Sequence, residues 1–136
     1  MNNIPKLRAK PVQHEGNEQE TLFDWAALAR CRFPELDLLY HIPNGGSRNR
    51  LEAANLRRQG VKSGVPDLCL PVARGGYHGL YIEMKYGKNK TSENQNKWLV
   101  DLRAQDYAIA VCYGWQEAQQ VITDYLERRK QSRRKI

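Results

Sequence analysis

The sequence lacks a long hydrophobic run. A helix that crosses a bilayer needs about 20 consecutive apolar residues, and no apolar run in these 136 residues approaches that length. The N-terminal stretch MNNIPKLRAKPVQHEGN has no apolar core of the kind found in secretory signals. We therefore expect a cytoplasmic protein with no membrane partner.

Cysteine and histidine are also scarce, with three of each. Cys31, Cys69 and Cys112 are isolated and stand in apolar surroundings, so we expect buried, reduced thiols and no disulfide framework. No Cys-x-x-Cys pair occurs and the histidines are scattered, which argues against a structural zinc site.

Acidic residues are outnumbered, and the net charge is +7. The last eleven residues, LERRKQSRRKI, contain six Lys/Arg and one Glu, and so supply 6 − 1 = 5 of these charges. Two interpretations stay open, a solvated tail and a basic arm that contacts phosphate. We expect a flexible segment over 1–13, one domain over 14–127 and a basic tail over 128–136.

Hydrophobic spacing predicts a first helix from about Glu15 to Arg32, which Pro34 ends. The further expected elements are a strand over 36–42, a basic helix over 48–59, strands over 67–72 and 80–85, a helix over 91–106, a strand over 107–114 and a helix over 115–129. The two middle strands are expected to form a hairpin, and the helix after them to return the chain to a parallel strand. This order predicts an α/β fold, a three-layer sandwich with a mixed central sheet flanked by helices.

Finer features of these elements are also predicted. Ser92 and Gln95 match a capping box at the start of the helix over 91–106. The strand over 107–114 is apolar almost throughout, as a strand covered on both faces is. The tryptophans lie on apolar helix faces and are interpreted as core residues: Trp25, Trp98 and Trp115.

The strand LYIEMK contains two charges that its apolar neighbours do not predict. Glu83 and Lys85 are two residues apart and so point to one face. Alone, they favour a surface ion pair. Asp67 begins the expected partner strand, however, and pairing can bring it opposite them.

Two carboxylates at one place repel each other and need a cation. An oxygen-only donor set predicts Mg²⁺ or Mn²⁺, and the backbone carbonyl of Met84 could be a further ligand. Lys85 would then orient a metal-activated water or neutralise the charge of the transition state.

The residues around this pattern resemble a known family. PD at 66–67 and EMK at 83–85 resemble the signature of the PD-(D/E)XK nucleases. The wider pattern resembles the VRR-NUC branch, the virus-type replication-repair nucleases, over Glu15 to Leu126. It comprises NGG at 44–46, Arg48, GVPDL at 64–68, YIEMK at 81–85 and SENQ at 92–95, with Glu15, Gln19 and Trp25 in the first helix.

This resemblance implies a restriction-endonuclease-like fold and metal-dependent hydrolysis of phosphodiester bonds in DNA. Asp67 and Glu83 would ligate the metal and Lys85 would serve the attacking water. Glu15 would complete the acidic cluster, although Glu18, one turn on, is an open alternative. Gln95 would support the site, although a capping box alone accounts for a glutamine there.

Small stand-alone members of this family look like homodimers that act in DNA repair on branched DNA such as four-way (Holliday) junctions, in phages or bacteria. The expected DNA contacts are Asn44, Arg48, Lys62, Lys88 and Lys90. Asn44 to Arg48 could instead be a simple turn. The alternative function is a basic nucleic-acid-binding module on the same fold that does not cut.

Overall fold

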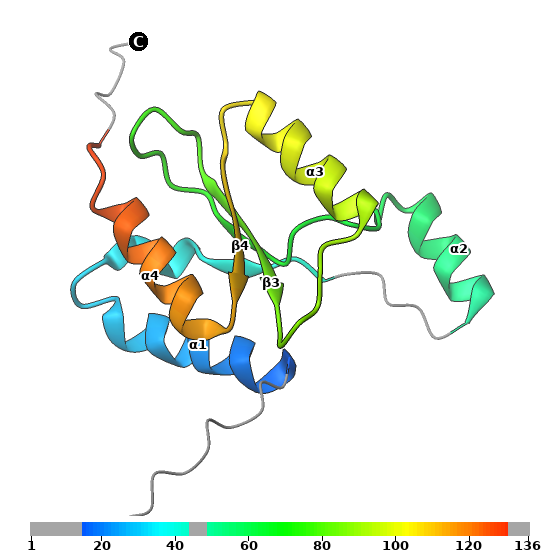
Figure 1. The fold of residues 1–136 in the computed structure, drawn as a ribbon, viewed down its shortest axis with the longest axis horizontal. Helices are drawn as coiled ribbons and strands as arrows, with labels where there is room; N and C mark the ends of the chain where they lie inside the picture. The colour runs from blue at the N-terminus through cyan, green and yellow to red at the C-terminus, as the bar shows by residue number, and fades with distance from the viewer. Residues whose placement is uncertain (1–14, 44–48, 131–136) are drawn as a thin grey trace, which may run out of the picture.

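The computed structural model describes residues 15–43 and 49–130. Within them, a four-stranded sheet is surrounded by helices (Figure 1). The elements are, in chain order, α1 (Glu15–Ala29), η1 (Pro34–Leu38), β1 (Tyr40–His41), α2 (Arg50–Arg58), β2 (Leu68–Leu70), β3 (Leu80–Lys85), α3 (Glu93–Ala104), β4 (Ala108–Tyr113) and α4 (Trp115–Leu126).

The strand order in the sheet is β1-β2-β3-β4. β1 with β2 and β2 with β3 are antiparallel, while β3 and β4 are parallel and joined by α3. The sheet is therefore mixed, which confirms the predicted hairpin, the predicted crossover and the α/β class.

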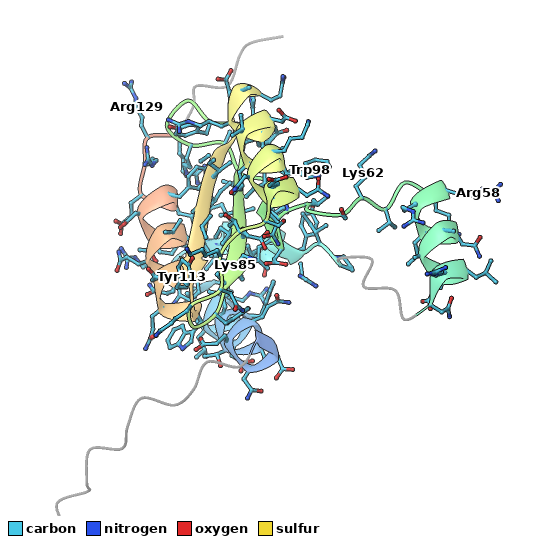
Figure 2. The ribbon with its side chains drawn as sticks, turned by 45° about the vertical axis from the view of Figure 1, so that its right-hand side comes forward. Arg58, Lys62, Lys85, Trp98, Tyr113 and Arg129 are labelled. Carbon is cyan, nitrogen blue, oxygen red and sulfur yellow. The ribbon has the colours of Figure 1, made fainter. Side chains whose placement is uncertain are left out.

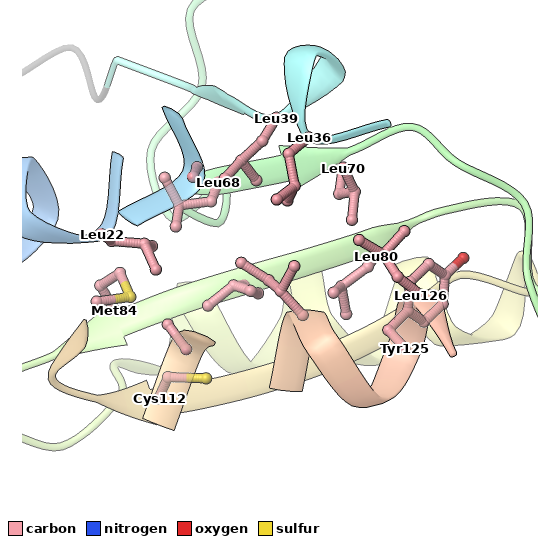
Figure 3. Packing of buried hydrophobic residues seen from close by; sticks show 14 of the residues in the cluster. Leu22, Leu36, Leu39, Leu68, Leu70, Leu80, Met84, Cys112, Tyr125 and Leu126 are labelled. Carbon is pink, nitrogen blue, oxygen red and sulfur yellow. The ribbon is translucent and has the colours of Figure 1, made fainter. Parts of the chain in front are cut away.

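Helices cover both faces of the sheet, with α1 and α4 on one face and α3 on the other (Figure 1). The main core lies under α1 and α4, where side chains of β2 and β3 meet apolar residues of both helices (Figure 3). Leu22 of α1 and Ile122 of α4 are fully buried there, against Leu68, Ile82 and Met84 of the strands. Because these strand side chains face the core, the residues between them point to the opposite face of the sheet.

One helix stands apart from these layers. No residue of α2 is buried, and Leu51 is 74% exposed. Asn49 caps the helix, since its side chain accepts a hydrogen bond from the Glu52 N–H at 2.7 Å. Figure 1 shows α2 extending from the body of the protein beyond the start of α3.

Three predictions about the elements were wrong in part. Pro34 begins the 3-10 helix η1, which leaves only Tyr40–His41 of the expected strand over 36–42. Val111 and Tyr113 of β4 are exposed, because α3 covers their face of the sheet only in part. Cys31 is exposed because it follows the end of α1, whereas Cys69 and Cys112 are buried as expected.

The tryptophans also differ from one another. Trp25 and Trp115 pack against the core, as predicted. Trp98 is half-buried on the outer side of α3, away from that cluster. In the described part of the chain, no helix is both long and apolar enough to cross a membrane.

Candidate active site

The candidate site is built on the alternation of side chains along β3. Its even-numbered residues, Leu80, Ile82 and Met84, are buried in the core. Glu83 and Lys85 therefore point to the opposite face, the one that α3 partly covers. The charged residues that interrupt the apolar strand share one face, as the sequence predicts.

Glu83 is deeply buried, with 2% of its surface exposed. Its Oε1 accepts a hydrogen bond from the Gln95 side-chain amide at 2.9 Å. The Lys85 Nζ lies 3.8 Å from the same oxygen, and its side chain is 13% exposed. A buried carboxylate needs such partners, because burial without them is costly. The surface ion pair that the sequence left open is therefore excluded.

Asp67 directly precedes β2 and lies beside Glu83 of β3. Leu68 pairs with Ile82, and continuing this register by one residue places Asp67 opposite Glu83. The Met84 N–H donates a hydrogen bond to the Asp67 Oδ2 at 2.8 Å. On its other side, the Asp67 carbonyl accepts a hydrogen bond from the Ile42 N–H at 2.7 Å. These contacts hold the aspartate at the junction of β1, β2 and β3.

Gln95 makes two kinds of contact, one within the helix cap and one to Glu83. Its Oε1 accepts a hydrogen bond from the Ser92 N–H at 2.8 Å, and its own N–H donates to the Ser92 Oγ at 3.2 Å. These two bonds form the predicted capping box. The side-chain nitrogen Nε2 of Gln95 donates to Glu83, so the cap and the buried carboxylate share one side chain.

The helix-one acids occupy different positions. Glu15 is the first residue of α1, and its side chain lies outside the described residues, as do Asn44 and Arg48. The Glu18 Oε2 accepts a hydrogen bond from the Trp115 N–H at 2.9 Å. Glu18 thus supplies a cap to α4, whose own N-cap residue, a glycine, has no side chain to do so.

The three described lysines that the sequence predicts as DNA contacts are all exposed. Lys88 and Lys90 lie on the loop between β3 and α3. Lys62 lies after α2 and shares a cleft with Trp98 (Figure 2). Lys62 and the two loop lysines thus come from different segments of the chain.

Tyr113 is a neighbour of the site that sequence reasoning missed. It pairs with Lys85 across the parallel strands, and it is 38% exposed on the same face (Figure 2). Its hydroxyl donates a hydrogen bond to the Asn89 carbonyl at 2.9 Å, which ties the lysine-bearing loop to β4. Tyr113 could have been found from the sequence only if the register of the parallel strands β3 and β4 had been known.

Tyr81 precedes Glu83 on this face. Burial, followed by the nearby Cys69 thiol, raises the pKa of Tyr81 to about 12. The Tyr107 ring meets it edge-on, with the ring centroids 5.2 Å apart. Tyr81 is therefore neutral at physiological pH and adds no negative charge beside the carboxylates.

The donor set of the site fits a hard divalent ion. Asp67 and Glu83 offer carboxylate oxygens and Met84 a backbone carbonyl. Among the described side chains, which leave out Glu15, no three His, Cys, Asp or Glu gather closely enough to enclose a metal. Mg²⁺ commonly keeps several waters and binds one or two carboxylates together with substrate phosphate, which an open pair can provide.

Comparison with known proteins agrees with this geometry. The family model for the VRR-NUC domain matches residues 12–116. A solved structure described as a VRR_NUC domain protein is similar, with 32% sequence identity and a TM-score of 0.75. The alignment covers 87% of this chain and 92% of that one. Among the curated proteins, the search finds no match. The chain belongs to the VRR-NUC family of nuclease domains.

Proposed function

We propose that this protein is a divalent-metal-dependent endonuclease that hydrolyses phosphodiester bonds in DNA. One observation carries the proposal: a carboxylate buried to 2% exposure, Glu83, lies in register with Asp67 and is held by Lys85 and Gln95. A buried carboxylate with a specific charged partner is typical of a functional site. The VRR-NUC fold supports the assignment to nucleic-acid cleavage.

In this proposal Asp67, Glu83 and the Met84 carbonyl hold Mg²⁺ or Mn²⁺, and Glu15 adds a carboxylate directly or through water. Such an ion would supply Lewis-acid chemistry and would lower the pKa of a bound water. The Met84 N–H orients one Asp67 oxygen, so the other can face the ion. Gln95 fixes the Glu83 carboxylate from the side of α3.

Lys85 completes the proposed chemistry. Its ammonium offers three hydrogen-bond donors and lies beside Glu83 with little solvent around it. From there it can orient the attacking water and donate to a phosphate oxygen as negative charge builds up. Reduced solvent screening makes such a charge more effective than one at the surface.

The metal requirement is tested by titrating the protein with Mn²⁺ in a calorimeter and by following cleavage of labelled DNA in Mg²⁺ or in EDTA. We expect wild type to bind Mn²⁺ and cut only with metal, and Asp67→Asn to lose both. Asp24→Asn is the matched control, since Asp24 is an exposed acid of α1. Cleavage in EDTA, or equal Mn²⁺ binding by Asp67→Asn, contradicts the proposal.

The proposed substrate is branched DNA, in particular the four-way junction. A panel of junction, flap, splayed and linear duplex substrates at one salt concentration tests this, because binding through phosphates depends on salt. We expect the junction to be cut faster than linear DNA of the same sequence. Equal cleavage rates on junction and linear DNA would contradict the proposed selectivity but not the nuclease activity.

A further inference from the structure

A cleft of about 670 Å³ separates the outer side of α3 from the segment that follows α2. Its volume is in the range of small-ligand sites, roughly 300–1,000 Å³. Asp67, Glu83 and Lys85 do not line it. It is therefore a site distinct from the catalytic pair, and its lining indicates what it can bind.

The charge of the cleft is positive. Arg57, Lys62 and Lys97 line it against a single acid, Asp101, which leaves 3 − 1 = 2 positive charges. The acid pairs with Lys97 at 2.6 Å, but both side chains are more than half exposed, and surface pairs of this kind are weak. A phosphate group can therefore bind these cations in place of the carboxylate.

The cleft also has an aromatic wall. Trp98 lines it with two aliphatic residues, Val61 and Leu102. The Trp98 Nε1–H donates a hydrogen bond to the Ser63 carbonyl at 3.1 Å, which fixes the orientation of the indole. A fixed aromatic ring beside cations is the combination by which proteins hold unpaired nucleotides.

The walls of the cleft are continuous with the catalytic residues. Ser63 stands four residues before Asp67, and Asn94 directly precedes Gln95. The Asn94 Nδ2 donates a hydrogen bond to the Ser63 Oγ at 2.8 Å, so the two walls are joined. Figure 2 shows Trp98 on α3, with Lys62 beyond it on the segment that leads to α2.

We propose that this cleft binds one unpaired nucleotide of the DNA strand next to the cleaved phosphate. Trp98 stacks on its base, while Arg57, Lys62 and Lys97 contact its phosphates. The inference rests on the proposed nuclease function and adds to it a preference for substrates with an unpaired nucleotide near the cut, because a base within a duplex has no free face for the indole.

The test measures binding without cleavage, by fluorescence anisotropy of a labelled oligothymidylate in EDTA. A second probe of the same length carries abasic sites and so keeps the phosphates but not the bases. We expect Trp98→Ala to weaken binding of oligothymidylate by on the order of tenfold and to leave binding of the abasic probe unchanged. Val100→Ala, an exposed truncation on the same helix, is the control.

Charge variants test the phosphate contacts independently of Trp98. Lys62→Ala should weaken binding of both probes and reduce the slope of log affinity against log salt by about 0.7. Asp101→Asn should tighten binding of both, because it frees Lys97 and adds no bulk. Arg30→Ala, on the opposite face of the sheet, should change neither.

Equal weakening of both probes by Trp98→Ala would overturn the stacking contact, since the indole would then act only by holding Ser63. Unchanged binding in both Lys62→Ala and Asp101→Asn would overturn the phosphate contacts. These outcomes are distinguishable from failure of the proposed nuclease, because none requires metal or cleavage. If the wild-type protein cuts a junction but does not bind oligothymidylate, the nuclease proposal stands and the proposal that the cleft binds a nucleotide is wrong.

Discussion

Gln95 connects local structure with the proposed chemistry through a single amide. Its oxygen accepts from the Ser92 N–H, and its nitrogen donates to Glu83. Ser92→Ala removes the serine half of the cap and should lower the free energy of unfolding by about 1 kcal/mol. Gln95→Ala should cost about 1–2 kcal/mol more, because a buried carboxylate then loses a donor.

Urea denaturation and cleavage rates of the two variants separate these contributions. We expect Ser92→Ala to cut junction DNA at nearly the wild-type rate and Gln95→Ala to cut it more slowly. If both variants lose the same stability and keep the same rate, the contact between Gln95 and Glu83 has no functional weight, and Gln95 is only a capping residue.

At this scale the sequence predicts the interactions that act over a few residues. The capping box and the shared face of Glu83 and Lys85 follow from spacing alone, and both are confirmed. The burial of Trp98 does not follow from spacing, because an apolar helix position can face either the core or a cleft. Only the position of Ser63, brought to the indole by the fold, distinguishes the two.

At the scale of elements, the loop before β2 is locked against the first turn of α3. A Cβ at Gly64 would lie 2.9 Å from the Asn94 backbone carbon, and the glycine has a φ of +86°. Gly64→Ala should therefore cost about 3 kcal/mol, from both the strained backbone and the clash. The shift would also move Asp67, three residues on, and so lower cleavage.

Gly60→Ala is the matched control for this change. Gly60 also has a positive φ, +97°, but nothing lies within 4 Å of its added Cβ. The Gly60→Ala variant should lose only about 1 kcal/mol of its free energy of unfolding, from backbone strain. Chemical denaturation of both variants measures the difference. If both variants lose the same free energy of unfolding, the close approach of the loop to α3 does not contribute to stability.

The elements themselves could be predicted to different degrees. β3 has the predicted bounds, because both of its flanks carry turn residues. β4 was predicted to be covered on both faces, but a run of apolar residues does not reveal how far a helix extends over either face. The expected strand over 36–42 was shortened because the 3-10 turn that Pro34 begins competes with pairing to β2.

At the scale of the whole molecule, we propose that two copies of the chain associate. Two features are open to a partner: α2, which has no buried residue, and the unpaired edge of β4 within the described part of the chain. A homodimer would present two sites to the two cut strands of a junction. Sedimentation equilibrium should then give 2 × 15.8 = 31.6 kDa. A mass of 15.8 kDa at working concentration contradicts the dimer.

The architecture and the site could be predicted from the sequence to the extent that they follow from strand pairing. The hairpin of β2 and β3 brings Asp67 opposite Glu83, as the order of the strands predicts. The cleft beside α3 could not be predicted, because it depends on where the segment after α2 lies. No local pattern in that segment specifies its contact with Trp98.

The most direct test of the central claim is the single-turnover rate at which Glu83→Gln cuts a labelled four-way junction in Mg²⁺, compared with wild type. Glutamine keeps the shape and the buried amide contact, so a matching thermal melt verifies the fold. We predict a rate at least about a hundredfold lower, because even a change outside the ligand shell costs a metal site about 10- to 100-fold. Cleavage by Glu83→Gln at the wild-type rate would contradict the assignment of this site.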